Sequence, residues 1–234
     1  NNTYVYAING NFDDAQSEVK KIFTDEEIKE KLKKKNYSLS SANSINIGRL
    51  VPQIVYYFYS YMKLVERNEI VLGEKVNFTV PTGNFGDILA GYYAELMGLP
   101  VNKLICASNE NNVLYDFIKT GTYDRNRSFY KTLSPSMDIL ISSNLERLIY
   151  HLSKNDNKYV KSLMAELKSK GKYTVSQEIK NYIDNLFYAG YTTDLQTRET
   201  IKNIYSEYNY LLDTHTAVAY NVMKEFKEKD SRHK

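Results

Sequence analysis

The stretch KVNFTVPTGNFGDILAGYYAELMGLPVNKLICA, from Lys75 to Ala107, decides the fold class. Its first part, Lys75 to Val80, alternates apolar and polar residues with a period of two, which predicts a strand. Apolar residues then share one helical face (Ile88, Leu89, Tyr92 and Leu96), and Gly98 fits the left-handed position that ends a helix. Because Lys103 to Ala107 is typical of a second strand, the whole unit predicts a right-handed parallel crossover.

Gly83 and Gly86 lie at the turn between the predicted strand and helix. We expect the helix to begin near Asn84 or Phe85, where unpaired N–H groups and the positive end of the helix dipole favour an anion. The two glycines leave room for the backbone to approach a ligand closely, so the loop suits a phosphate. A glycine turn that only eases packing between helix and strand is the alternative. The loop lacks the first glycine of the dinucleotide fingerprint, where Pro81 stands, and the lysine of the Walker motif, where Asp87 follows Gly86.

The composition is that of an ordinary globular protein, with 234 residues, 42% apolar and 25% charged. A net charge of +3 is too small to indicate binding to nucleic acid or to an anionic membrane. No apolar run approaches the ~20 residues of a membrane span, and the opening residues lack the basic region of a signal peptide. The single cysteine, Cys106, favours a cytoplasmic protein, and its apolar strand favours packing over a nucleophilic role.

Periodicity predicts the elements on either side of this unit. Tyr4 to Ile8 resembles a strand, and the helix after it should turn Ala15, Val19, Ile22 and Phe23 inward. Acidic residues at 25–27 should open a second helix, and lysines should end it. The run from Ile45 to Lys63 predicts one broad buried face, with Pro52 kinking the helix or starting a second one. The members of that face are Ile47, Leu50, Val51, Ile54, Val55, Phe58, Tyr59 and Met62.

The later part of the chain is expected to be mainly helical. A short helix should lie around Asn112 to Lys119, and further helices at 176–187, 192–208 and 214–227. We therefore divide the chain into an α/β part at 1–143, which holds the glycine loop, and a mostly helical part at 144–234.

A second candidate site precedes the glycine loop. Ser44, Asn46 and Arg49 stand near a predicted helix N-terminus, and the last two share a helix face. Hydroxyl, amide and guanidinium groups together suit a phosphate or carboxylate, although a capping segment with a surface arginine fits equally well. No metal site is expected, because the three histidines lie far apart in the sequence (His151, His215 and His233).

Five blocks of sequence, taken in order, carry a family resemblance. They are NSINIGRLVPQIVYYF, VPTGNFGDILAGYYAELMGLP, ICASNENNVL, LSPSMDILISSNLERL and DTHTAVAY. Together they resemble threonine synthases of the longer bacterial and fungal type, which are similar in fold to tryptophan synthase β. The resemblance implies an α/β fold with a parallel-sheet core and two lobes, and pyridoxal phosphate in the cleft between them.

The resemblance also implies an activity and a site. Threonine synthases convert O-phosphohomoserine and water to threonine and phosphate. On this basis Gly83, Asn84, Phe85 and Gly86 would cradle the cofactor phosphate, while Ser44, Asn46 and Arg49 would face the substrate. The glycine loop lies within the second of the matching blocks, and Ser44, Asn46 and Arg49 lie within the first.

The chain departs from the family pattern in two places. The Phe-Lys-Asp type motif that carries the Schiff-base lysine is absent, and so is the Ser/Thr-rich segment expected after Tyr220. We therefore expect an internal piece of the enzyme, without a catalytic residue and inactive by itself. A non-catalytic relative acting as a binding or interaction module, or a threonine dehydratase-like enzyme, are the alternatives.

Overall fold

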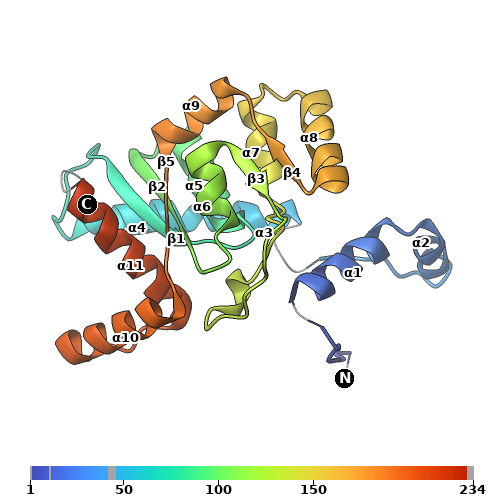
Figure 1. Ribbon diagram of the computed structural model, residues 1–234, viewed down its shortest axis with the longest axis horizontal. Helices are drawn as coiled ribbons and strands as arrows, with labels where there is room; N and C mark the ends of the chain where they lie inside the picture. Colours follow the sequence, from blue (N-terminus) through green and yellow to red (C-terminus); the bar gives the residue numbers. More distant parts are fainter. Residues whose placement is uncertain (1, 11, 42–45, 231–234) are drawn as a thin grey trace.

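The computed structural model describes residues 2–10, 12–41 and 46–230. At its centre is a parallel sheet with the strand order β1-β2-β5 (Figure 1). The strands are β1 (Val76–Pro81), β2 (Val101–Ser108) and β5 (Phe187–Tyr191). The predicted parallel pairing of Val76–Val80 with Leu104–Ala107 is confirmed, and so is the α/β class with a parallel-sheet core.

The other elements are mostly helices, together with two short strands, β3 and β4. In chain order these are α1 (Phe12–Thr24), α2 (Glu26–Lys33), α3 (Ile47–Leu50), the 3-10 helix η1 (Val51–Gln53), α4 (Ile54–Glu66), α5 (Gly86–Leu96), α6 (Val113–Thr120), β3 (Thr122–Asp124), the 3-10 helix η2 (Pro135–Met137), α7 (Leu145–Leu152), α8 (Asn157–Lys170), β4 (Lys172–Thr174), α9 (Gln177–Leu186), α10 (Asp194–Tyr208) and α11 (Thr214–Lys229). The short β3 and β4 pair antiparallel. The predicted helices at 176–187, 192–208 and 214–227 are confirmed as α9, α10 and α11.

Apolar side chains pack on both faces of the sheet. In β2, Leu104 and Cys106 belong to the large cluster beneath α4, α5, α6 and α9. Ile105 and Ala107 belong to a second cluster, on the other face, with residues of α11. Side chains of a strand alternate between faces, so a strand buried on both sides needs a continuous apolar run. The run ending in Ile105, Cys106 and Ala107 meets that requirement, and the packing role expected for Cys106 is confirmed.

Two predictions near the N-terminus are wrong. Tyr4 to Ile8 form no strand, because no described strand lies beside them, and Val5 is 91% exposed. The predicted inward face of α1 is not buried either: Val19 and Ile22 are exposed, and only Ala15 and Phe23 are half-buried. Figure 1 shows the reason, since α1 and α2 project from the body of the molecule. The second helix itself is confirmed, with Asp25 as its N-cap.

The buried face of α4 also differs from the prediction. Leu50 is fully buried, but much of the predicted face is exposed (Ile47, Val51, Val55, Tyr59 and Met62). Pro52 lies in η1, so the helix restarts at Ile54 with a shifted phase. Tyr57 and Tyr61 are buried instead, because each hydroxyl finds a backbone partner, at Asp87 and Glu74 respectively.

The part of the chain after Ser143 is mostly helical, as predicted, but it also supplies β4 and β5. The sequence analysis did not predict β5, which pairs with β2 and completes the central sheet. Both parts of the chain therefore contribute strands to one sheet. The division into two parts at residue 143 stays a prediction. Within the described ranges, no helix has the length and apolar character to cross a bilayer.

Candidate functional site

The glycine loop lies where β1 ends and α5 begins, at the carboxyl edge of the parallel sheet. The helix begins at Gly86, next to the predicted start, and Phe85 is its N-cap residue. Phe85 has a φ of 63° and a ψ of 9°, in the left-handed region that an aromatic residue rarely adopts. Its ring is buried and lies 5.8 Å, centroid to centroid, from that of Phe187 in β5. Packing against the sheet thus fixes the left-handed turn.

The backbone N–H groups of this loop lack an acceptor in the described part of the chain. Among the described residues, no acceptor takes a hydrogen bond from the N–H of Gly83, Asn84, Phe85 or Gly86. A left-handed residue followed by a helical one makes a concave nest of N–H groups, and the helix dipole adds positive potential there. The loop borders a hollow of about 220 Å³, which Gln53 and Asp87 also line. An anion therefore has donors and a path to them.

Asp87 opposes anion binding at this helix end. It stands in the first turn of α5, and its carboxylate lies 3.2 Å from the Tyr57 hydroxyl. Desolvation raises the pKa of Asp87, and the hydrogen bond from Tyr57 partly offsets that rise. Burial, and then the charge of Asp87, raise the pKa of Tyr57 well above its ordinary value. The phenol therefore stays a hydrogen-bond donor at neutral pH.

Gly83 is needed for a reason that differs from the expected one. A Cβ at this position would lie 2.8 Å from the carbonyl oxygen of Ser136 and 3.2 Å from the Cα of Met137. The close approach at Gly83 is therefore to the turn η2 of the same chain. The close approach of a ligand expected at Gly83 stays a prediction.

The carbonyl groups of the loop, unlike its N–H groups, have partners. The Ser142 hydroxyl donates to the Gly83 carbonyl oxygen at 2.9 Å. The backbone N–H and the side-chain Nδ2 of Asn144 both donate to the Asn84 carbonyl oxygen, at 3.1 and 2.9 Å. The sequence analysis missed both residues, and the only signal for them is their place in the block LSPSMDILISSNLERL.

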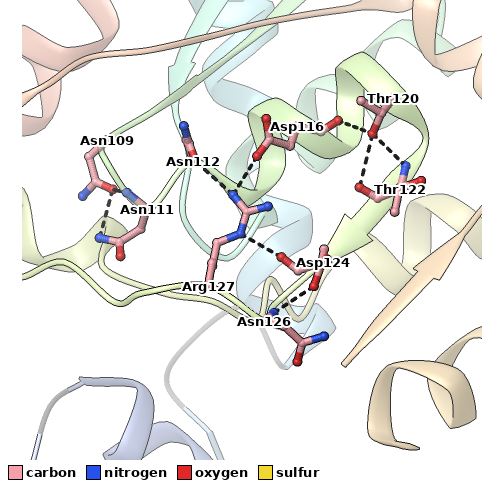
Figure 2. Close-up of polar contacts among 9 residues, drawn as sticks. All are labelled: Asn109, Asn111, Asn112, Asp116, Thr120, Thr122, Asp124, Asn126 and Arg127. Atoms are coloured by element: carbon pink, nitrogen blue, oxygen red, sulfur yellow. Dashed lines mark hydrogen bonds and ion pairs between the residues drawn. The ribbon is translucent and has the colours of Figure 1, made fainter. Parts of the chain in front are cut away.

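A buried polar network holds the segment that leads to Ser142. Asp138 accepts hydrogen bonds from the side chains of Asn109, Asn111 and Thr132, at 2.7 to 3.0 Å. The contact between Asn109 and Asn111 is part of Figure 2. Such a fully satisfied network rigidifies the chain around it.

Beside it, Figure 2 shows Arg127 donating to Asn112 and Asp116 at 2.9 and 2.7 Å, which ties the same segment to α6.

The second candidate site is only partly defined by the structure. Ser44 lies outside the described residues. Asn46 caps α3, because its side chain accepts from the Gly48 N–H at 2.9 Å. Arg49 is exposed on α3, and its carbonyl accepts from Gln53, a residue of the hollow beside the glycine loop. The capping role accounts for Asn46, and Arg49 lies one helical turn from the hollow.

The chain is similar to several threonine synthases in sequence. No model of a known protein family matches it. It is 41% identical over 230 residues to threonine synthase of Saccharomyces cerevisiae, covering 93% of this chain and 43% of the relative. It is 42% identical over 224 residues to threonine synthase of Pseudomonas aeruginosa, covering 96% and 45%. It is also 42% identical to human threonine synthase-like 1, covering 93% and 30%.

The fold agrees with this similarity. The crystal structure of threonine synthase from Brucella melitensis, with bound pyridoxal phosphate, has a TM-score of 0.81 and 44% identity, covering 94% of this chain and 45% of that one. The yeast threonine synthase structure has a TM-score of 0.80 and 40% identity, covering 95% and 44%. This chain corresponds to a segment of threonine synthases. It spans less than half the length of these relatives.

Proposed function

We propose that this chain is part of a cytoplasmic threonine synthase, a pyridoxal-phosphate-dependent carbon–oxygen lyase. Its reaction converts O-phosphohomoserine and water to threonine and phosphate. The observation that supports this most directly is the set of free N–H groups at Gly83, Asn84, Phe85 and Gly86, at a helix N-terminus. The segment aligns with an enzyme crystallised with pyridoxal phosphate.

In this proposal the glycine loop binds the cofactor phosphate through backbone N–H groups. The cofactor, when bound, supplies an electron sink for carbanion chemistry. Ser44, Asn46 and Arg49 are assigned to substrate binding, and the Arg49 guanidinium is suited to the phosphate of O-phosphohomoserine. Nothing in the proposal calls for nucleic acid, a membrane or a metal.

We propose further that the chain by itself makes no threonine. The Phe-Lys-Asp type motif is absent from it, so no lysine is held against the cofactor with the high effective concentration that covalent catalysis needs. The glycine loop alone makes only part of the contacts to the cofactor, so binding should be weak.

The test compares the full-length protein with this chain alone. Each is supplied with pyridoxal phosphate and O-phosphohomoserine, and the release of threonine and phosphate is measured. The full-length protein should turn over, and this chain should not. Turnover by the chain alone would place the catalytic lysine within it. A full-length protein that instead forms 2-oxobutanoate from threonine would be a dehydratase, and one with no activity would be a binding module.

A paired substitution tests the loop. Gly86→Asp puts a carboxylate at the start of α5, whereas Met97→Asp puts the same group at the C-cap of α5, where the side chain is 66% exposed. If the loop binds the cofactor phosphate, Gly86→Asp should weaken affinity for pyridoxal phosphate at least tenfold, and Met97→Asp should leave it nearly unchanged. Equal effects of the two variants would argue against the loop.

A further inference from the structure

We infer that Ser142 and Asn144 are positioning residues for the phosphate-binding loop. They hold the carbonyl groups of Gly83 and Asn84 on one side, and so turn the N–H groups of Asn84 and Phe85 to the other side. The inference rests on the proposed function and deepens it, because it assigns the orientation of the loop to two side chains outside it.

The first step is peptide geometry. In a planar trans peptide the C=O and the following N–H point in opposite directions. The Gly83 carbonyl receives the Ser142 hydroxyl, so the N–H of Asn84 points away from Ser142. The Asn84 carbonyl receives two donors from Asn144, so the N–H of Phe85 points away from Asn144. These are two of the four free N–H groups of the loop.

The second step is the unusual use of Asn144. It occupies the N-cap position of α7, where an asparagine side chain ordinarily accepts a hydrogen bond from a backbone N–H of the helix. Asn144 makes no such bond. Its Oδ1 accepts from Arg147, and its Nδ2 therefore faces the Asn84 carbonyl. The Asn144 Nδ2 therefore holds the glycine loop, while its Oδ1 bonds the Arg147 side chain of α7 and caps no backbone N–H of that helix.

The third step is the support behind Ser142. The Ser142 N–H donates to the hydroxyl of Tyr123 at 2.7 Å, and that hydroxyl donates to the Leu140 carbonyl at 2.9 Å. The Tyr123 ring stacks on Tyr173 across β3 and β4, with centroids 5.4 Å apart and an interplanar angle of 3°. Ser142 and Asn144 are themselves 6% and 1% exposed. The Ser142 hydroxyl and the Asn144 Nδ2 are therefore held in a buried segment that these contacts support.

The fourth step is strain. Phe85 has a positive φ of 63°, which costs a non-glycine residue free energy and persists only when the surroundings impose it. The two peptides before Phe85 are the ones whose carbonyls are held. Without these bonds the loop can rotate its peptides and lose the concave arrangement of N–H groups.

The experiment uses the full-length apoprotein and two probes, pyridoxal 5′-phosphate and pyridoxal, which lacks the phosphate. The dissociation constant of each is measured by titration, and their ratio reports the phosphate contribution alone. Ser142→Ala and Asn144→Ala should each weaken binding of pyridoxal phosphate roughly threefold to tenfold, with pyridoxal changed less than about twofold. Ser142→Thr keeps the hydroxyl and should restore the ratio.

Ser143→Ala is the matched control, because the buried Ser143 hydroxyl has no hydrogen-bond partner among the described residues. It should leave the ratio unchanged. An unchanged ratio in Ser142→Ala and Asn144→Ala would overturn the inference, as would equal losses for both probes or an equal effect of Ser143→Ala. A wild-type protein that binds both probes equally would overturn the proposed phosphate site itself, which is a distinct result.

Discussion

Tyr57 donates its hydroxyl hydrogen to the backbone carbonyl of Asp87 at 2.8 Å, which joins α4 to the first turn of α5. Tyr57 is 4% exposed, so its hydroxyl is removed from water and bonds only the backbone carbonyl of Asp87 and the carboxylate beside it. Tyr57→Phe should therefore destabilise the protein by about 1 kcal/mol at pH 7. The midpoint of urea unfolding measures this.

The same phenol gives a pH dependence. Burial and the charge of Asp87 raise the pKa of Tyr57 well above its ordinary value near 10. A group whose pKa is raised by folding stabilises the fold below its unfolded-state pKa and loses that contribution as pH rises. Wild type should therefore lose stability faster than Tyr57→Phe above about pH 10, where unfolded tyrosine ionises. Parallel stability curves from pH 7 to 11 would contradict this.

Gly91 should resist substitution although it lies inside α5. Alanine ordinarily stabilises a helix interior by ~1 kcal/mol relative to glycine. Here a Cβ would lie 2.6 Å from the Tyr57 ring and 2.9 Å from Leu104. Gly91→Ala should therefore lower stability by about 1 to 3 kcal/mol. Thermal unfolding measures the change, and the loss should shrink in a Tyr57→Ala background. A raised melting temperature would mean that the neighbours yield easily.

Cys106 should be inert in the native protein. The side chain is fully buried in β2, and burial raises the pKa of its thiol to about 12. Because the thiolate is the reactive species, iodoacetamide should label the native chain only through unfolding, at pH 7 and at pH 9 alike. Mass spectrometry of the labelled protein, with a urea-unfolded control, measures this. Rapid native labelling at pH 9 would contradict the packing role.

Arg49 is predicted to bind the phosphate of O-phosphohomoserine. In the full-length protein, Arg49→Lys replaces a bidentate fork with a point charge, so the KM for O-phosphohomoserine should rise roughly tenfold. Affinity for pyridoxal phosphate should not change. Arg198→Lys is the control, because Arg198 is exposed on α10, far along the chain. Unchanged kinetics in Arg49→Lys would leave Arg49 with a structural role only.

Local pattern was enough to predict the unit that holds the site. Strand alternation, a helical stripe and Gly98 defined β1, α5 and β2, and the C-terminal end of α5 follows from Gly98, which has a φ of 98°. Tertiary contacts decided the rest. The strand β5 is a short run of aromatic and small residues with no alternation, and only its pairing with β2 makes it a strand. Tyr57 and Tyr61 became core residues because their hydroxyls found partners.

The candidate site shows the same division. The glycine spacing predicted an anion-binding loop, because the donors are backbone groups of the loop itself, and the family resemblance implied the set of four residues. Ser142 and Asn144 could not be, since they contact the loop from 59 and 60 residues away in the sequence. No periodicity links residues at that separation. Gly83 was singled out for the close approach of a ligand, and its contact with Ser136 was not foreseen, because that contact exists only in the folded chain.

The hydrogen bonds that Ser142 and Asn144 make to the glycine loop also imply an order of events during folding. The local unit from β1 to β2 can form early, because its contacts close a short loop. The hydrogen bonds from Ser142 and Asn144 close a much longer one, 59 and 60 residues in length. On this reasoning the nest is aligned only once α7 has docked. Phosphate binding should then be recovered late in refolding, and a partly folded chain should not bind phosphate.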